Sequence, residues 1–275
     1  MDIFTCKISL PAWSFLPIKI GLLLLLLLPA FFWVGHINQK TESLASLDTA
    51  PVTTNDNDAV AEPPQAASSW LKGIDVSHFQ GQIKWHNVSQ SGIKFAFAKA
   101  TGGMAYVDPQ FANNWHGMRA NDVLRGAYHY YYAADDATKQ AQHFLQTVGP
   151  MTVSDLPPVL DVEILDNVAA SKLVAGVLVW LQEVEKATGR KPIIYSDLSF
   201  AIEYLSDNRL KGYYLWIADY EKKPQTLPQP WQASGWHFWQ YSESSIVQGV
   251  DGEVDMDYFQ GDKAALQQLI AASQV

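Results

Sequence analysis

Two acidic side chains near the middle of the chain have the type and spacing for acid–base chemistry. Asp161 and Glu163 alternate with Leu160, Val162 and Ile164 in a short apolar segment. Successive side chains of a β-strand point to opposite faces, so an extended segment presents both carboxyls on one face. Their proximity raises the pKa of one of the pair, as a general acid near neutral pH requires. Taken alone, the pattern also fits a solvated acidic rim or an ion pair.

Two further acids lie in apolar segments at the ends of the same region. Asp75 lies near its beginning and Asp255 near its end, with Asp257 two residues later. If the first and last strands close a barrel, they are neighbours, and both acids meet Asp161 and Glu163 at the mouth. A turn or capping role is the alternative for Asp75, and the adjacent Asp257 weakens the case for Asp255.

Aromatic side chains gather on the same segments. Any one of them fits core packing, but together they favour a carbohydrate ligand, because sugar rings present apolar C–H faces that stack on aromatic rings. The residues concerned are Tyr128, Tyr130, Tyr131, Tyr132, Tyr195, Trp216, Tyr220, Trp239 and Tyr241. His129 lies among them and fits a catalytic base, a metal ligand or a hydrogen-bonded structural histidine. His78 and His116 have no spacing typical of a metal site.

Alternating short strands and amphipathic stretches must position these residues. Strands are predicted over residues 73–78, 95–101, 125–131, 159–164, 193–196, 214–220, 237–241 and 254–259. The clearest helix is predicted over 172–188, with Ser171 as N-cap and Gly189 after its end. Further helices are predicted over 137–148 and 263–272. This order indicates a parallel α/β barrel, made irregular because the later strands lie too close together for full crossover helices.

The composition excludes several classes of function. The formal net charge of −9, with no Lys/Arg cluster after residue 70, disfavours a nucleic-acid partner. Cys6 is the only cysteine, which excludes an internal disulfide and thiolate metal motifs. The apolar fraction of 48% is ample for one sizeable core.

The N-terminal region reads as an export segment followed by a tether. The apolar run of residues 20–34, with Lys7 and Lys19 upstream, predicts an uncleaved single-pass anchor over residues 1–37, since Trp33 suits a membrane interface and no small-residue cleavage site follows. Residues 38–69 are rich in Ala, Ser, Thr, Asp and Pro and predict a disordered linker. The catalytic domain is expected over residues 70–275, held at a bacterial inner membrane and facing the periplasm or exterior. Secretion after cleavage of a signal peptide is the alternative.

Eight ordered sequence blocks lie between residues 73 and 259. The blocks are Gly73-Ile74-Asp75-Val76-Ser77, Lys99-Ala100-Thr101 with Asp108-Pro109-Gln110-Phe111, Arg125-Gly126-Ala127-Tyr128-His129, Leu160-Asp161-Val162-Glu163, Pro192-Ile193-Ile194-Tyr195-Ser196, Leu215-Trp216-Ile217-Ala218, Phe238-Trp239-Gln240-Tyr241 and Val254-Asp255. In this order they resemble glycoside hydrolase family 25, the Chalaropsis-type lysozymes.

The resemblance implies a modified α/β barrel that hydrolyses the β-1,4 bond between N-acetylmuramic acid and N-acetylglucosamine in peptidoglycan. Glu163 matches the family's general acid, and Asp161 matches the carboxylate that supports a substrate-assisted or a direct nucleophilic route. Asp75 and Asp255 match acids that tune this pair. The predicted substrate-binding residues are Tyr128, His129, Tyr195, Trp216, Tyr220, Trp239 and Gln240. No metal or cofactor is expected, and we expect a monomer.

Two positions depart from the family pattern, and other functions stay open. Gly102 and Gly103 follow the Lys-Ala-Thr triplet where the family commonly has Glu, and Asp257 stands where Asn is common. A peptidoglycan-binding module without turnover is the main alternative. A chitinase or N-acetylhexosaminidase also uses an Asp-x-Glu pair, and a partner-regulated wall enzyme of a secretion or division apparatus is a third reading.

Overall fold

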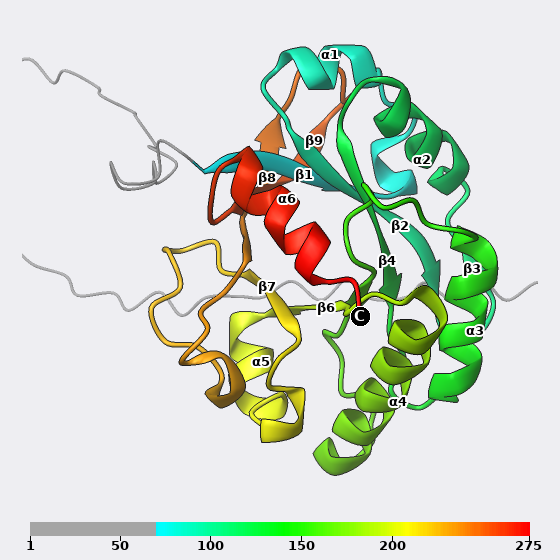
Figure 1. The fold of residues 1–275 in the computed structure, drawn as a ribbon, viewed down its shortest axis with the longest axis vertical. Helices are drawn as coiled ribbons and strands as arrows, with labels where there is room; N and C mark the ends of the chain where they lie inside the picture. Colours follow the sequence, from blue (N-terminus) through cyan, green and yellow to red (C-terminus); the bar gives the residue numbers. More distant parts are fainter. Residues whose placement is uncertain (1–69) are drawn as a thin grey trace, which may run out of the picture. The chain divides into compact units, whose positions relative to one another are not determined.

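The computed structural model describes residues 70–275, which contain one closed β-barrel flanked by helices (Figure 1). Nine strands form a single sheet in the order β1-β9-β8-β7-β6-β5-β4-β2-β3, and pairing of β1 with β2 closes it, which leaves β3 outside the ring. The strands are β1 (Leu71–Val76), β2 (Phe95–Gly102), β3 (Tyr106–Val107), β4 (Leu124–Tyr130), β5 (Val159–Asp161), β6 (Ile193–Asp197), β7 (Tyr214–Ala218), β8 (Phe238–Ile246) and β9 (Glu253–Phe259). The predicted irregular barrel is confirmed.

Seven of the eight barrel strands run parallel to a neighbour, and β9 does not. β9 pairs antiparallel with both β8 and β1, so the expectation of an all-parallel barrel is wrong at this point. Residues 247–252 join β8 to β9, and a connection this short can join only antiparallel strands. The barrel still closes as expected, because the first and last strands are neighbours.

Six α-helices and three short 3-10 helices complete the described chain. The α-helices are α1 (Trp85–Gln90), α2 (Phe111–Ala120), α3 (Ala137–Val148), α4 (Ala170–Thr188), α5 (Leu198–Tyr204) and α6 (Lys263–Ala272). The 3-10 helices are η2 (His78–Gln80), η3 (Asn208–Leu210) and η4 (Gln229–Trp231). The three predicted helices are confirmed.

Helix α4 begins earlier than its sequence signals predict. Its N-cap is Ala169, whose side chain makes no capping bond, so the prediction of Ser171 as N-cap is wrong. A turn with Asp166 and Asn167 at positive φ (54° and 58°) precedes the helix and sets where the chain enters it. Gly189, at φ 63°, ends the helix in the left-handed conformation as predicted.

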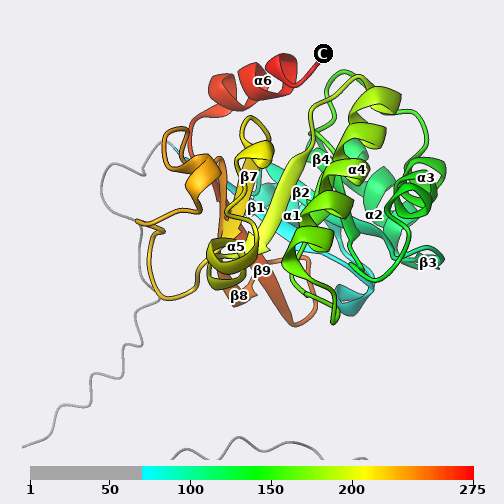
Figure 2. The same ribbon diagram turned by 90° about the horizontal axis from the view of Figure 1, so that it is seen from below.

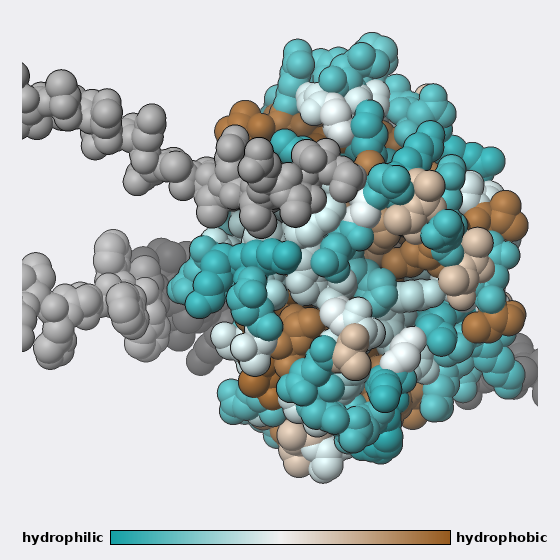
Figure 3. Space-filling view, turned by 60° about the vertical axis from the view of Figure 1, so that its left-hand side comes forward, coloured by the Kyte–Doolittle hydropathy of each residue, from teal (hydrophilic) through white to brown (hydrophobic). Residues whose placement is uncertain are grey.

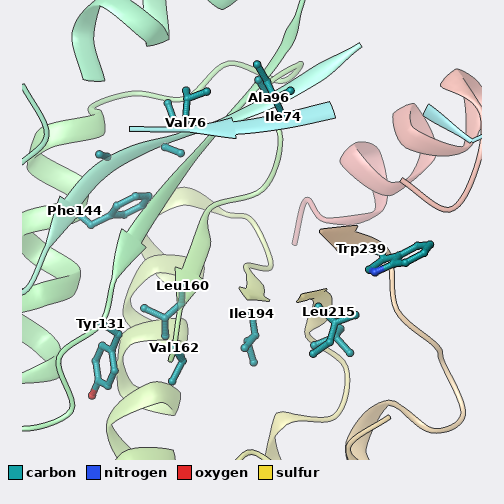
Figure 4. Packing of buried hydrophobic residues seen from close by; sticks show 14 of the residues in the cluster. Ile74, Val76, Ala96, Tyr131, Phe144, Leu160, Val162, Ile194, Leu215 and Trp239 are labelled. Carbon is teal, nitrogen blue, oxygen red and sulfur yellow. The ribbon is translucent and has the colours of Figure 1, made fainter. Parts of the chain in front are cut away.

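Two apolar layers lie on the two faces of the barrel wall. The outer layer packs strand side chains such as Leu160, Val162 and Ile194 against the surrounding helices (Figure 4). The inner layer fills the barrel with residues that include Phe95, Phe97, Trp216, Phe238 and Phe259. Burial of both wall faces stabilises the barrel through the hydrophobic effect.

Two glycines make room for the large rings inside the barrel. A Cβ at Gly73 would lie 2.3 Å from the ring of Phe95, and one at Gly126 would lie 2.3 Å from the ring of Phe97. Any side chain at either position would displace a phenyl ring, so glycine is required there.

Helix α6 covers the barrel end where the parallel strands begin. Its Leu266, Leu269 and Ile270 join the inner layer, next to Leu71 and Leu124 at the first residues of β1 and β4. Figure 2 shows α6 lying across one end, apart from the helices that flank the side of the barrel. The opposite end, where the parallel strands finish, is left free for a functional site.

The predictions for residues 1–37 and 38–69, an anchor and a linker, lie outside the described residues. Within residues 70–275, no helix combines the length and apolar character that crossing a bilayer requires. Figure 3 shows one face of the molecule, on which hydrophilic residues predominate and hydrophobic ones form separate small patches.

Candidate active site

A pocket of about 300 Å³ opens at the barrel end where the parallel strands finish. Side chains from β1, β2, β4, β5, β6, β7, β8 and β9, or from residues just after them, line it. The lining residues are Asp75, Lys99, Tyr128, Tyr130, Asp161, Glu163, Tyr195, Trp216, Tyr220, Gln240, Glu243 and Asp255. All four predicted catalytic acids therefore share one pocket.

Asp161 and Glu163 reach the pocket from the end of β5. The strand finishes at Asp161, earlier than predicted, but Val162 N donates to Tyr195 O (2.9 Å) and keeps the chain extended for one more residue. Leu160 and Val162 point into the outer apolar layer. The alternation that places both carboxyls on the inner face is confirmed by their shared pocket.

Burial raises the pKa of both carboxyls. For Asp161 the shift is large, and the nearby Glu163 adds to it while Lys99 opposes it. Asp161 Oδ1 is buried and has no hydrogen-bond partner in the described structure. For Glu163 burial is again the main cause, and Lys99 and Tyr195 oppose it. The pair therefore retains a proton at a pH where exposed carboxyls have lost theirs.

Asp75 and Asp255 face each other across the β1–β9 pair, where they are register partners. Burial and the neighbouring Asp255 raise the pKa of Asp75 well above its ordinary value. Burial, Glu243 and Glu163 raise the pKa of Asp255 to about 6. Like charges in a confined space share protons, so the mouth of the barrel can both supply and accept them.

Gln240 connects one of these acids to two aromatic side chains. Its Nε2 donates to Asp75 Oδ2 (2.7 Å), and its Oε1 accepts from the hydroxyls of Tyr195 (2.8 Å) and Tyr220 (2.7 Å). The amide is buried, and each of these bonds fixes the direction of a side chain in the pocket wall.

Of three further predicted ligands, two line the pocket and one does not. Tyr128 and Trp216 line the pocket, and Trp216 Nε1 also donates to Asp257 Oδ1 (2.8 Å) behind it. Trp239 does not line the pocket: it is buried in the outer layer, where its Nε1 donates to Asp219 O (2.8 Å). The prediction that Trp239 binds substrate is therefore wrong.

His129 also lies on the outer face of the barrel wall. Its Nδ1 is 2.7 Å from Thr101 Oγ1, its Nε2 is 3.2 Å from Gln140 Oε1, and its ring stacks on Trp180 with centroids 5.7 Å apart. Burial lowers its pKa to about 3, so the ring is neutral at physiological pH. Of the readings that the sequence left open, the hydrogen-bonded structural histidine is confirmed, and the prediction of a substrate ligand is wrong.

Lys99 is a pocket residue that the sequence interpretation missed. Its Nζ lies 4.6 Å from the ring centroid of Tyr130 and 5.8 Å from that of Tyr128, and its charge lowers the pKa of Asp161 and Glu163. Lys99 is the only cation among the residues that line the pocket. A lysine inside an otherwise apolar segment, 95–100, was the available signal.

Glu243 was also missed, while Tyr130 was named only within the group of aromatic residues and Asp257 only as a neighbour of Asp255. Tyr130 and Glu243 line the pocket, and Asp257 lies buried beneath Trp216 with Oδ2 unpaired in the described structure. Alternation along the strands was the available signal, since Tyr130 shares a face with Tyr128 and Asp257 shares one with Asp255.

The comparisons with known proteins agree with this geometry. The family model described as "Glycosyl hydrolases family 25" matches residues 74–250. Protein YegX of Escherichia coli (strain K12) is 41% identical over 214 residues, which cover 74% of this chain and 75% of that protein. Lysozyme M1 of Streptomyces globisporus is 31% identical over 218 residues, which cover 73% and 71%.

The fold of this chain is also similar to that of a solved structure. The crystal structure of the bacterial lysozyme from Streptomyces coelicolor superposes with a TM-score of 0.70 and 31% sequence identity, covering 75% of this chain and 99% of that one. The family match spans more than half of the chain and includes three of the four acids at the mouth. The chain therefore belongs to glycosyl hydrolase family 25, and it is a glycosidase.

Proposed function

We propose that this glycosidase is a muramidase, which hydrolyses the β-1,4 bond between N-acetylmuramic acid and N-acetylglucosamine in peptidoglycan. One observation carries the residue assignment: Asp161 and Glu163 share a pocket with Asp75 and Asp255, and Lys99 is the only cation that lines it. Relatives named lysozyme and N,O-diacetylmuramidase support the substrate class.

Glu163 is the proposed general acid. It is only partly buried, at the outer end of the pair, where the oxygen of a leaving sugar can approach it. Burial raises its pKa, which keeps the carboxyl protonated closer to neutral pH than an exposed glutamate. Protonation of the glycosidic oxygen lets the leaving sugar depart as a neutral alcohol.

Asp161 is the proposed carboxylate that supports the reacting sugar. Its buried Oδ1 lacks a partner in the described structure, which suits an acceptor for the N–H of the substrate's acetamido group. In that route the acetamido oxygen attacks the anomeric carbon, and in the direct route Asp161 itself attacks. Both routes retain the configuration of the anomeric carbon.

The remaining pocket residues are proposed to hold the substrate and to tune this pair. Asp75 and Asp255 place further carboxyls in the same pocket: Asp75 raises the pKa of Asp161, and Glu163 raises the pKa of both Asp75 and Asp255. The rings and the amide that line the pocket give C–H stacking surfaces and hydrogen-bond partners for sugar hydroxyls. The proposed ligands are Tyr128, Tyr195, Trp216, Tyr220 and Gln240.

We also propose that residues 1–37 anchor the chain in a bacterial inner membrane and that the catalytic barrel acts outside it as a monomer. The apolar run of residues 20–34 and the following polar stretch support this location. Carbonate extraction of membranes, with protease treatment of intact spheroplasts, tests it. A protein that is released by carbonate, or protected from protease, contradicts the proposal.

Muropeptide analysis tests the reaction. Purified peptidoglycan is incubated with the full-length protein and with two variants, Glu163→Gln and Glu203→Gln. Glu203 is exposed on α5 and is the matched control. We expect new reducing-end muramic acid from the wild type and from Glu203→Gln, and none from Glu163→Gln.

Two other outcomes support the competing functions. Binding to the cell wall without release of fragments by any variant supports a binding module. Faster cleavage of chitin oligomers than of peptidoglycan supports a chitinase or N-acetylhexosaminidase.

A further inference from the structure

Four aromatic side chains form a strip beside the mouth of the barrel, next to the ends of β1, β2 and β4. The aromatic strip consists of His78, Phe79, Tyr106 and Tyr132. Phe79 is 81% exposed, Tyr106 40% and Tyr132 39%. Large apolar side chains that stay this exposed next to a catalytic pocket mark a binding surface.

Hydrogen bonds hold part of the strip in place. His78 donates its backbone N–H to Asp108 Oδ2 (2.9 Å), and its Nδ1 lies 3.0 Å from the same oxygen. The hydroxyl of Tyr106 lies 3.0 Å from His78 Nδ1, and the ring of Phe79 packs on that of His78 with centroids 4.1 Å apart. The rings therefore lose little further freedom when a ligand binds.

The strip is continuous with the catalytic pocket. Lys99 Nζ lies 6.0 Å from the ring centroid of Tyr106 and 4.6 Å from that of Tyr130, and Tyr130 lies 5.3 Å from Tyr132. Gly102 lies between these two rings, since a Cβ there would lie 3.5 Å from Tyr130 Cβ and 3.6 Å from the Tyr106 ring. The strip therefore adjoins the pocket lining at Lys99 and Tyr130.

We propose that the aromatic strip binds sugar units of the glycan strand that extend beyond the catalytic pocket. The proposal rests on the muramidase function. A pocket of about 300 Å³ is at the lower limit for small-molecule sites, so a polymeric substrate must continue outside it. Exposed rings match the apolar C–H faces of sugars.

Cleavage of glycans of two lengths tests the strip. The substrates are a tetrasaccharide and an octasaccharide of alternating N-acetylglucosamine and N-acetylmuramic acid without stem peptides. For Phe79→Ala in the full-length protein, we expect KM to rise about five- to tenfold on the octasaccharide and to stay unchanged on the tetrasaccharide. Phe79→Tyr should restore the wild-type KM. Val153→Ala, at a similarly exposed site before β5 (75% against 81% for Phe79), is the control.

Binding of the same glycans, measured by calorimetry, separates this proposal from the proposed function. Octasaccharide binding that depends on Phe79 supports the strip even if no bond is cut. Cleavage of both substrates with no effect of Phe79→Ala overturns the strip and leaves the muramidase intact. An equal effect on both lengths, or an effect seen only when stem peptides are attached, also overturns it.

Discussion

Buried charged side chains lie at both ends of the barrel, and the two groups are built in opposite ways. At the end where the strands begin, Arg125 and Asp155 form an ion pair with Nε–Oδ1 2.8 Å and Nη2–Oδ2 3.2 Å. Arg125 Nη1 also donates to Trp115 O (3.0 Å), and Asp155 Oδ2 accepts from Thr152 N (2.7 Å). The ion pair is balanced in charge and its hydrogen bonds are satisfied, and the buried Arg190 lies beside it and donates to Asp155 O (2.7 Å).

At the mouth and directly beneath it, acids outnumber bases and some polar atoms are unpaired. Asp75, Asp161 and Asp257 are buried beside one another, and burial is the main cause of the raised pKa of each. Asp161 Oδ1 and Asp257 Oδ2 have no partner in the described structure. Lys99 is the only cation that lines the pocket.

The two groups differ in their effect on stability: the ion pair is tolerated in the fold, and the acid cluster lowers the free energy of unfolding. A buried ion pair with satisfied hydrogen bonds is costly to break, because either partner left alone is a buried unpaired charge. A buried cluster of like charges is costly to keep, and its raised proton affinity is what acid catalysis uses. Substitutions at the two ends should therefore change different quantities.

The largest expected effect is on catalysis, from Asp161→Asn. We expect kcat to fall on the order of 10³-fold, because the amide can neither attack the anomeric carbon nor accept the acetamido N–H in the same way. The midpoint of thermal unfolding at pH 7 should not fall, since the replaced carboxyl is unfavourably buried. Release of reducing ends and circular dichroism measure the two quantities.

Asp251→Asn is the matched control for this change, because Asp251 is exposed between β8 and β9. It should leave both quantities unchanged. A large loss of thermal stability in Asp161→Asn would contradict the comparison, since it would make Asp161 a structural residue like Asp155.

The second effect is on stability, from Arg125→Met at the other end. We expect the free energy of unfolding to fall by about 3 kcal/mol, because Asp155 loses its ion-pair partner in a buried site. Urea denaturation measures it, and kcat at low temperature should be unchanged because Arg125 does not line the pocket.

The double change Arg125→Met with Asp155→Asn is the control for this prediction. It should recover part of the lost stability, since the unpaired carboxylate is gone. If the single and double variants are equally unstable, packing of the Arg125 side chain on Trp115, rather than the unpaired charge, accounts for the loss.

The contrast between the ends was only partly predictable from the sequence. Alternation within one strand placed Asp161 and Glu163 on one face, and apolar segments bounded by turns located the eight barrel strands. Both faces of the barrel wall are apolar, however, so alternation alone does not say which face is inside. Which side chains of a strand point into the barrel depends on the register of that strand with its neighbours, and register is a non-local property.

His129 and Trp239 show this limit. In the β4–β5 register Tyr130 pairs with Asp161 and His129 pairs with Leu160, so His129 must face outward once Asp161 faces inward. Trp239 and Gln240 are adjacent on β8 and cannot both face the pocket. Alternation along β8 is enough to exclude Trp239 once Gln240 is taken as a pocket residue. The outward position of His129 can be predicted only when the register between β4 and β5 is known.

The third prediction concerns Lys99, which partly balances the acids at the mouth. Its charge lowers the pKa of Asp161 and of Glu163, so Lys99→Met should raise both and move the pH–activity profile to higher pH. On the acidic side of the optimum, kcat/KM should fall on the order of tenfold.

A pH series of kcat/KM measures this shift, and Lys99→Arg, which keeps the positive charge, is the control. The profile of Lys99→Arg should stay close to that of the wild type. A uniform loss of activity at all pH values in Lys99→Met would mean that Lys99 contacts the substrate and does not tune the acids.

The smallest expected effect is a gain of stability, from Asp257→Asn. Asp257 is fully buried, and its Oδ1 accepts from Trp216 Nε1 (2.8 Å), a bond that an asparagine oxygen can keep. Burial, Asp75 and Asp255 raise its pKa in the folded chain. The stability that the protonated acid contributes is therefore complete below its unfolded pKa and is lost as the pH rises through its folded pKa.

Asparagine carries no such loss, so the two proteins should be equally stable at low pH and should differ at high pH. We expect the free energy of unfolding of Asp257→Asn to exceed that of the wild type by about 1 kcal/mol at pH 8 and to equal it near pH 4. Urea denaturation across that pH range measures the difference. Parallel curves for the two proteins would mean that Asp257 is not held protonated at the mouth. A gain that grows with pH would place Asp257 with the acids whose burial costs stability, in contrast to Asp155 at the other end.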